Sequence, residues 1–224
     1  MTEKHPYLKP FAKYVMLNVL GMLGLSCYIL ADTFFISKGL GTLGLTALNL
    51  ALPVFSFIQG VSLMLRVGGG IKYAVAKASG DQKSANSTFT VTLVLSAVLS
   101  LIFVLLGALA SRPLTTFLRA DSEVFEMTHQ YLKVILLFAP AFIFSNILAS
   151  FVRNDGNPKL AMFATLFGSL FNIVMDYVLI FPCGMGILGA VLATGIAPVT
   201  GIVICGFHWI LKKGPLRVAK TDFK

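Results

Sequence analysis

The sequence predicts an all-α membrane protein whose fold is a bundle of six transmembrane helices. Of its 224 residues, 57% are hydrophobic and 12% are charged, whereas soluble domains carry about 25% charged residues. Several runs without a charged residue are about as long as the roughly 20 residues needed to cross the hydrocarbon core of a bilayer. Because lipid offers the backbone no hydrogen bonds, each of these runs is expected to be a helix.

The six helices follow from the apolar runs taken in chain order. Charge-free stretches at 39–65, 89–110, 134–152 and 177–211 define the second, third, fourth and sixth helices. The first and fifth helices are apolar segments that each contain one acidic residue. The helices are expected to cover about residues 11–36, 43–66, 88–110, 130–152, 159–181 and 187–211. Short loops connect them, so residues 1–224 are predicted to form a single six-helix transmembrane lobe.

The longest expected inner loop joins the second and third helices. It carries the glycine triplet 68–70 and the segment Ser79-Gly80-Asp81, and both are turn signals. Between them, residues 71–78 are expected to form a short amphipathic helix on the membrane surface. In the outer loop that precedes the fourth helix, Asp121 or Ser122 is expected to cap the start of that helix.

The formal charge of +9 is distributed as expected for a membrane protein. If the N-terminus is cytoplasmic, 14 of the 18 basic residues fall on the cytoplasmic side, as the positive-inside rule requires. The prediction is a multi-pass protein of the cell (inner, cytoplasmic) membrane with both termini cytoplasmic. A role in nucleic-acid binding is not favoured. The 14 residues are Lys4, Lys9, Lys13, Arg66, Lys72, Lys77, Lys83, Arg153, Lys159, Lys212, Lys213, Arg217, Lys220 and Lys224.

Residue patterns typical of enzymes are not found in the sequence. The three cysteines are odd in number and lack metal-ligand spacing, and no nucleophile–base pair or phosphate loop occurs. His129 and His208 stand without an evident partner, so they are assigned no role. The sequence therefore predicts a protein that is not an enzyme and holds no cofactor or metal, apart from a coupling ion considered below.

Two acidic residues, Asp32 and Asp176, lie within the predicted helices. A charged group in the bilayer costs roughly 2.5–3.5 kcal/mol by insertion measurements, so such residues usually face a cavity and have a function. The alternative is that each carboxylate simply reaches the outer interface from near its helix end. Asn172 lies one turn before Asp176, and Tyr28 one turn before Asp32, so each acid has a polar neighbour on its own helix face.

The two acids are expected to lie at one depth. With a rise of ~1.5 Å per residue, Asp32, Asn172, Asp176 and Thr194 all fall in the outer half of the membrane. Two carboxylates, an amide and a hydroxyl at one level can hold a proton or a hard monovalent cation. The sequence therefore predicts an H+ or Na+ site formed by these four residues.

Other residues are candidates for the substrate cavity or for gating. Pro53, Pro140 and Pro198 lie inside predicted helices, where a proline removes a backbone hydrogen bond and can bend the helix. The alternative is that these prolines are simply tolerated. The segments from Gly39 to Pro53 and from Gly184 to Pro198 also resemble each other in their glycine spacing, and this places Asn49 opposite Thr194. Asn49 and Tyr28 complete this set of candidates.

Four segments resemble the multidrug and toxic compound extrusion (MATE) family of transporters, in particular its MepA-type branch. Ala31–Ile36 resembles the family's Asp-containing signature at the end of its first helix, and Phe151–Pro158 resembles its inner loop between the fourth and fifth helices. Asn172 with Asp176 is similar to its fifth-helix Asn-x-x-x-Asp pattern, and Gly189–Thr194 to the start of its sixth helix.

The resemblance implies the N-terminal six-helix lobe of a cation-coupled multidrug antiporter that works by alternating access. It implies that Asp32 and Asp176 are the protonatable acids, with Asn172 and Thr194 as neutral ligands. The substrates would be amphipathic, often cationic small molecules, bound between this lobe and a second one supplied by a longer chain or by a second copy. One departure is Leu17, where many members have a proline, so a bend of the first helix is in doubt.

Three other functions stay open at this level. One is a lipid-linked saccharide flippase of the same superfamily, whose cavity should carry more basic residues than these helices offer. Another is a membrane-embedded enzyme acting on lipids. The last is a truncated remnant that no longer transports.

Overall fold

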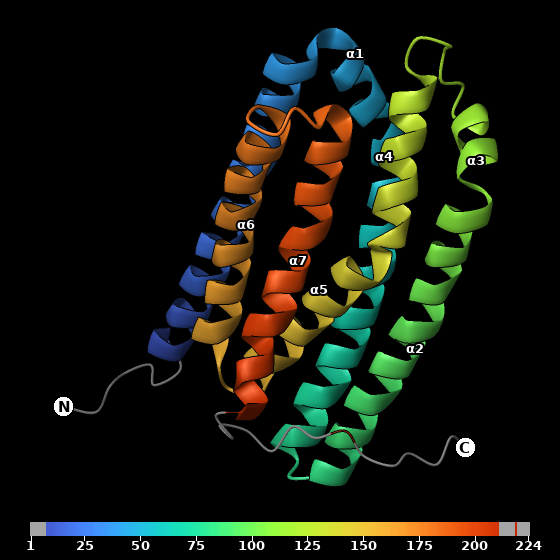
Figure 1. Ribbon diagram of the computed structural model, residues 1–224. Helices are drawn as coiled ribbons and strands as arrows, with labels where there is room; N and C mark the ends of the chain where they lie inside the picture. Colours follow the sequence, from blue (N-terminus) through green and yellow to red (C-terminus); the bar gives the residue numbers. More distant parts are fainter. Residues whose placement is uncertain (1–7, 211–217, 219–224) are drawn as a thin grey trace.

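A computed structural model describes residues 8–210 and residue 218, and every regular element in that part of the chain is an α-helix. The long helices run roughly along one direction, and α5 crosses the bundle obliquely (Figure 1). They are α1 (Leu8–Ala78), α2 (Gln82–Leu109), α3 (Ser111–Phe117), α4 (Phe125–Leu137), α5 (Ala139–Asn154), α6 (Pro158–Ile180) and α7 (Gly186–Ile210). The start of α1, its end at Ala78, the turn between α5 and α6, and the end of α7 lie at one end of the bundle, here named the terminal end (Figure 1).

The long helix α1 folds back on itself at Gly41. Its 71 residues would extend ~107 Å at ~1.5 Å per residue, several times the ~30 Å of a hydrocarbon core. Gly41 has φ 65° and ψ −153°, values that are non-helical and open to glycine. The chain rises to this point as a first limb and returns beside it as a second limb (Figure 1).

The two segments with similar glycine spacing, Gly39 to Pro53 and Gly184 to Pro198, also share a feature of backbone conformation. Gly186, the counterpart of Gly41, also has a positive φ, of 60°, and lies at the start of α7. Both glycines allow a sharp entry into a helix that leads back toward the terminal end.

Replacing Gly41 by alanine is expected to lower the free energy of unfolding by about 1–3 kcal/mol, the cost of a non-glycine residue in a sparsely populated backbone region. No atom lies within 4 Å of the added Cβ, so the loss would come from the backbone alone. Gly60 is a matched control, because it has the same open surroundings without a positive φ, and alanine there should cause no loss. Thermal unfolding in detergent tests both; equal Tm values would contradict the prediction.

The predicted fold class, an all-α membrane bundle, is confirmed. Within the described residues, four helices are long and apolar enough to cross a membrane, and the bent pair α4–α5 provides a fifth candidate. Because α1 contributes two limbs, the bundle has six segments that can span a bilayer. Large apolar side chains on the outside, such as Leu30 at 72% exposure and Leu109 at 79%, suit contact with lipid.

One loop prediction was wrong. Residues 68–70 do not form a turn, and 71–78 is not a separate surface helix, because α1 continues without a break to Ala78. The glycines serve packing instead: a Cβ on Gly69 would collide with Thr92 and approach Phe151, and one on Gly70 would approach Asn154. Because glycine has no side chain, the second limb can lie close against α2 and α5 at these positions.

The turns at the terminal end follow from their residues. Gly80, with φ 80°, ends α1, and the side chain of Asp81 then caps α2 by accepting a hydrogen bond of 2.9 Å from the Ser84 backbone N–H. Gly156, with φ 100°, plays the same part after α5, and Asn157 caps α6. A glycine followed by a capping side chain thus makes each reversal, in agreement with helix-end preferences.

The predicted fourth span is two helices, α4 and α5, bent by 45° at Phe138. Pro140 lies in the first turn of α5, where it has no N–H to donate to the preceding turn. Pro53 and Pro198, in contrast, lie inside helices that continue through them. Neither Asp121 nor Ser122 caps α4, which begins five residues before the expected start and has Val124 at the capping position.

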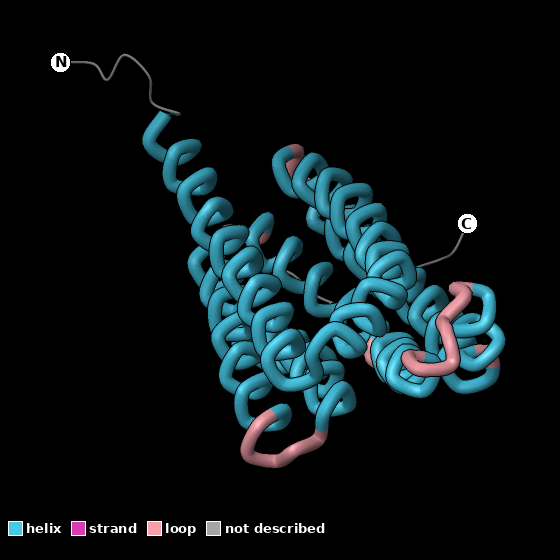
Figure 2. The backbone as a smooth tube through the Cα atoms, turned by 90° about the horizontal axis from the view of Figure 1, so that it is seen from above, coloured by secondary structure: helices cyan, strands magenta, loops and turns pink. Residues whose placement is uncertain are grey.

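Seen along the helix axes, the first limb of α1 projects from the bundle toward its N-terminal end (Figure 2). Its apolar side chains are widely exposed there, for example Met16 at 65% and Met22 at 66%. The first limb is helical through Leu17 without a break. The core lies instead among the second limb, α2, α4 and α5, with fully buried residues such as Ile58, Leu132 and Ile147.

Candidate ion-binding site

The structure brings together the four residues predicted to form the ion site. Asp32 comes from the first limb of α1, Asn172 and Asp176 from α6, and Thr194 from α7. All four are buried, with exposed fractions of 7%, 1%, 0% and 5% in that order. Both carboxyl groups are thus covered by the bundle itself, which favours the first of the two interpretations of these acids.

Glycines allow the three helices that carry these residues to approach closely. A Cβ on Gly24, two turns before Asp32, would meet the Leu166 side chain of α6 at 2.6 Å. A Cβ on Gly189 would lie 2.9 Å from the Leu179 backbone, so α6 and α7 pack main chain against main chain. The small residues of the sequence thus set the spacing of the helices around the site.

The carboxamide of Asn172 connects α6 to α7. In the amide orientation that satisfies both neighbours, its nitrogen donates to Asp176 Oδ2 at 3.1 Å and its oxygen accepts from the Thr194 backbone N–H at 3.2 Å. The oxygen end also lies 3.5 Å from Thr194 Oγ1. Asn172 therefore fixes one oxygen of Asp176 and leaves the other directed elsewhere.

The carboxyl groups of Asp32 and Asp176 are neighbours within hydrogen-bonding reach of each other. One oxygen of each, Oδ1, is buried and receives no hydrogen bond from any described residue. Ionised carboxylates only accept hydrogen bonds, so two of them cannot bond to each other without a proton or a cation between them. The pair is therefore suited to taking up one positive charge.

Two tyrosines complete the surroundings. Tyr28, predicted from its position one turn before Asp32, lies near both acids. Tyr131 of α4 was not predicted: it is buried, and its hydroxyl lies in hydrogen-bonding reach of Thr194. No sequence signal identified Tyr131, because it lies within the predicted helix 130–152 without an acidic or amide residue one turn away and meets Thr194 only through helix packing.

The remaining candidates are outside this cluster. Asn49 and Pro53 lie one turn apart on an exposed face of the second limb. Pro140 marks the bend at the start of α5, and Pro198 lies one turn beyond Thr194 in α7. The three prolines thus belong to three different helices, α1, α5 and α7.

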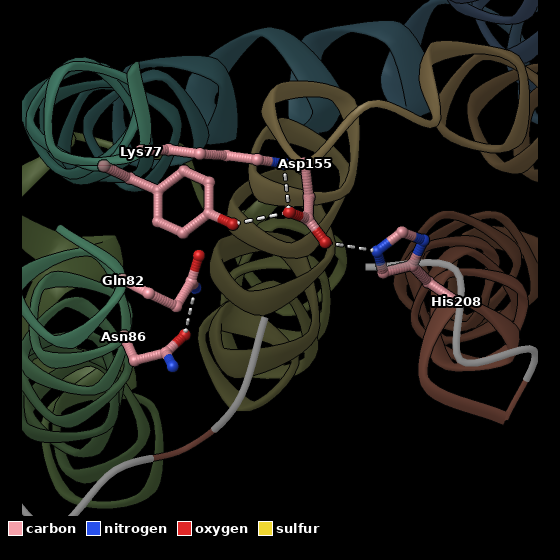
Figure 3. Close-up of polar contacts among 6 residues, drawn as sticks. Lys77, Gln82, Asn86, Asp155 and His208 are labelled. Carbon is pink, nitrogen blue, oxygen red and sulfur yellow. Dashed lines mark hydrogen bonds and ion pairs between the residues drawn. The ribbon is translucent and has the colours of Figure 1, made fainter. Parts of the chain in front are cut away.

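A second buried polar cluster lies at the terminal end, around Asp155 in the turn between α5 and α6 (Figure 3). Its Oδ1 accepts hydrogen bonds from Tyr73 Oη at 2.7 Å and Lys77 Nζ at 2.5 Å, and its Oδ2 lies 2.8 Å from His208 Nε2. His208, to which the sequence gave no partner, thus has one. His129 has one as well, since its Nε2 lies 3.2 Å from Ser111 Oγ.

The side chain of Asp155 is fully buried. Burial favours the neutral acid, but hydrogen bonds from Lys77, His208 and Tyr73 outweigh it and hold the pKa of Asp155 below its usual value. The carboxylate therefore stays ionised and connects the ends of α1 and α7 to the α5–α6 turn.

Six bilayer-spanning segments around a buried pair of acids define an integral membrane protein of the transporter type. A model of the MatE family matches residues 19–178, and the chain belongs to that family. This confirms the resemblance seen in its motifs.

Relatives and solved structures agree with this assignment. The multidrug export protein MepA of Staphylococcus aureus is 29% identical over 88% of this chain and 44% of its own length, and MepA of Staphylococcus saprophyticus is 27% identical over 94% and 47%. An outward-facing multidrug resistance MATE family transporter superposes with a TM-score of 0.85 at 29% identity, covering 94% of this chain and 48% of that one. A transporter of the MOP superfamily from Pyrococcus furiosus gives a TM-score of 0.88 at 27% identity, over 100% and 51%. The chain thus spans about half the length of these proteins.

Proposed function

We propose that this chain is one six-helix lobe of a cation-coupled multidrug exporter that works by alternating access. The observation that carries the proposal is the buried pair of neighbouring carboxyl groups of Asp32 and Asp176, each of which has one oxygen, Oδ1, without a donor among the described residues. Such a pair takes up a proton or Na+ and releases it when its surroundings change. Export of drugs by the MepA relatives supports the substrate class.

In this mechanism the pair alternates between two charge states. With an ion bound, Asp32 on α1 and Asp176 on α6 are held together across the interface between the two helices. Without it, two buried carboxylates repel each other, and the arrangement of the first limb against α6 becomes unfavourable. Asn172 and Thr194 provide neutral oxygen atoms that suit a hard monovalent cation. Ion binding and substrate binding then favour different arrangements of the lobe, which couples their movements.

The substrate would lie between this lobe and a second six-helix lobe, supplied by a longer chain or by a second copy. Amphipathic cationic compounds are the expected class. The exposed face of the second limb that carries Asn49 and Pro53 is a candidate for the cavity wall. Basic residues predominate among the segments at the terminal end, which supports a cytoplasmic location for that end. The proposed location of the protein is the cell membrane.

The test is dye transport by the gene product that contains this chain, reconstituted in liposomes. An imposed proton or sodium gradient is expected to drive ethidium, an amphipathic cation, against its concentration gradient. Each gradient is applied separately, which identifies the coupling ion. Transport that matches protein-free liposomes under both gradients would contradict the proposal. Movement of a lipid-linked saccharide without dye transport would favour the flippase alternative.

The second lobe has its own test. The reading frame after the codon for Lys224 is expected either to encode about six further apolar spans or to end, in which case the protein should purify in mild detergent with the mass of a dimer. A monomeric protein without further spans, inactive in dye transport, would indicate a non-transporting remnant.

A further inference from the structure

A crevice near the terminal end holds two arginines that the ion site does not use. It is about 130 Å³ in volume, whereas a single water needs only ~10–15 Å³ of such space. Its walls come from both limbs of α1, from α5 and from α6. Asn18, on the wall formed by the first limb, is fourteen residues before Asp32, or ~21 Å along the helix, so this is a separate site.

Among the described residues, Arg66 and Arg153 are the charged side chains of the crevice wall, and none of its lining residues carries a carboxylate. Both are half-buried, and their guanidinium groups are near enough to repel each other. Arg153 donates a hydrogen bond to the Asn18 side-chain oxygen, while no described residue accepts a hydrogen bond from the Arg66 side chain. Two partly desolvated like charges without a counter-charge are unfavourable by themselves.

The other walls indicate what kind of anion fits. Apolar side chains of the first limb and α6, including Leu17, Leu25 and Met162, form much of the lining. Met22, which also lines the crevice, is 66% exposed. The crevice therefore combines two cationic side chains with a largely apolar lining.

We propose that the crevice between Arg66 and Arg153 binds a phosphate group, carried by an anionic phospholipid or present as free phosphate. Each guanidinium presents five N–H donors in a planar fork, and such forks match the oxygen atoms of phosphate in paired hydrogen bonds. Two guanidinium groups offer more N–H donors than one carboxylate can accept, so a phosphate group fits them better. The apolar side chains of the lining suit contact with the acyl chains of a lipid.

The test is binding of dioleoyl phosphatidylglycerol to the purified protein in mild detergent, followed by the rise in Tm as lipid is added. Saturable stabilisation is expected, and Arg66→Gln or Arg153→Gln should weaken the apparent affinity about tenfold or more, as the loss of a charge-assisted hydrogen bond requires. Lys72→Gln, which removes an exposed positive charge six residues from Arg66 on the same limb, should leave the affinity within about twofold.

Inorganic phosphate at constant ionic strength distinguishes the two sources. If it raises the Tm in an Arg66-dependent way, the phosphate group alone suffices; if only the phospholipid does so, the acyl chains are required. Equal affinities of wild type and Arg66→Gln for phosphatidylglycerol would overturn the proposal, as would an equal effect of Lys72→Gln. Arg66→Gln keeps the test valid even if Arg153→Gln fails to fold, because no described residue depends on the Arg66 guanidinium.

Discussion

Replacing Asp155 by alanine is expected to lower the free energy of unfolding by about 3–5 kcal/mol, the typical cost of removing one partner from a buried ion pair. Asp155 accepts from Tyr73 and Lys77 and contacts His208, and these groups converge from α1 and α7 on the α5–α6 turn. Without the carboxylate, their polar atoms would remain at a buried position with no common acceptor. The measurement is the Tm and the denaturant midpoint in mild detergent.

Asp81→Ala is the matched control, because Asp81 is also an aspartate of a turn at the terminal end. It is exposed and caps α2 through a single hydrogen bond from the Ser84 backbone, so its loss should cost about 1 kcal/mol. Comparable Tm losses for the two variants would show that the Asp155 contacts contribute no more than an ordinary helix cap.

The same cluster gives a pH dependence with a definite sign. Because the folded-state pKa of Asp155 is lowered, its contribution is fully present above the unfolded-state pKa of about 3.9 and is lost as the pH falls through the folded-state pKa. The stability difference between wild type and Asp155→Asn should therefore shrink as the pH falls below about 4. The groups that face the carboxylate are Lys77, His208 and Tyr73.

Replacing Asp176 by asparagine is expected to reduce ion-driven dye transport to the level of protein-free liposomes. Asparagine has nearly the shape of aspartate but can neither take up and release a proton nor neutralise a bound cation. Asp176 is fully buried beside Asp32 and Asn172, so no solvent-exposed acid can replace it. The measurement is gradient-driven uptake, with dye exchange in the absence of a gradient as a second readout that does not require coupling.

Asp121→Asn removes a carboxylate from the exposed loop before α4 and should leave transport unchanged. If Asp176→Asn retains transport and its dependence on the ion gradient, Asp176 is not the coupling residue and the ion-site proposal fails. If the variant loses transport and its Tm also falls sharply, Asp32→Asn provides a second test of the same carboxyl pair.

The sequence placed the four residues of the candidate ion site at one level because each of them carries a local signal. Asp32 and Asp176 are acids within apolar segments, Asn172 is one turn from Asp176, and helix rise places Thr194 at a similar depth. The helix ends were less predictable. Glycines at 68–70 indicated a turn, but the absence of side chains there serves close helix packing, a contact that sequence alone does not reveal.

The Asp155 cluster could not be predicted, because its contacts join distant parts of the chain. Asp155 is 82 residues from Tyr73, 78 from Lys77 and 53 from His208. No local periodicity connects these positions, and Lys77 was expected in a short surface helix separate from the membrane-spanning second helix. Tyr131 was missed for a related reason, since its contact with Thr194 depends on how α4 packs against α7.

Three of the four residues of the ion site belong to one helical hairpin, α6 and α7, which the glycines hold main chain to main chain. Asn172, Asp176 and Thr194 therefore keep their positions relative to one another within this hairpin. Asp32 lies opposite this hairpin on the first limb of α1, and that limb protrudes from the bundle toward its N-terminal end (Figure 2). For the ion binding proposed above, the space available to the ion would depend on the distance between the first limb and this hairpin, so discrimination between a proton and a larger cation would follow from that distance.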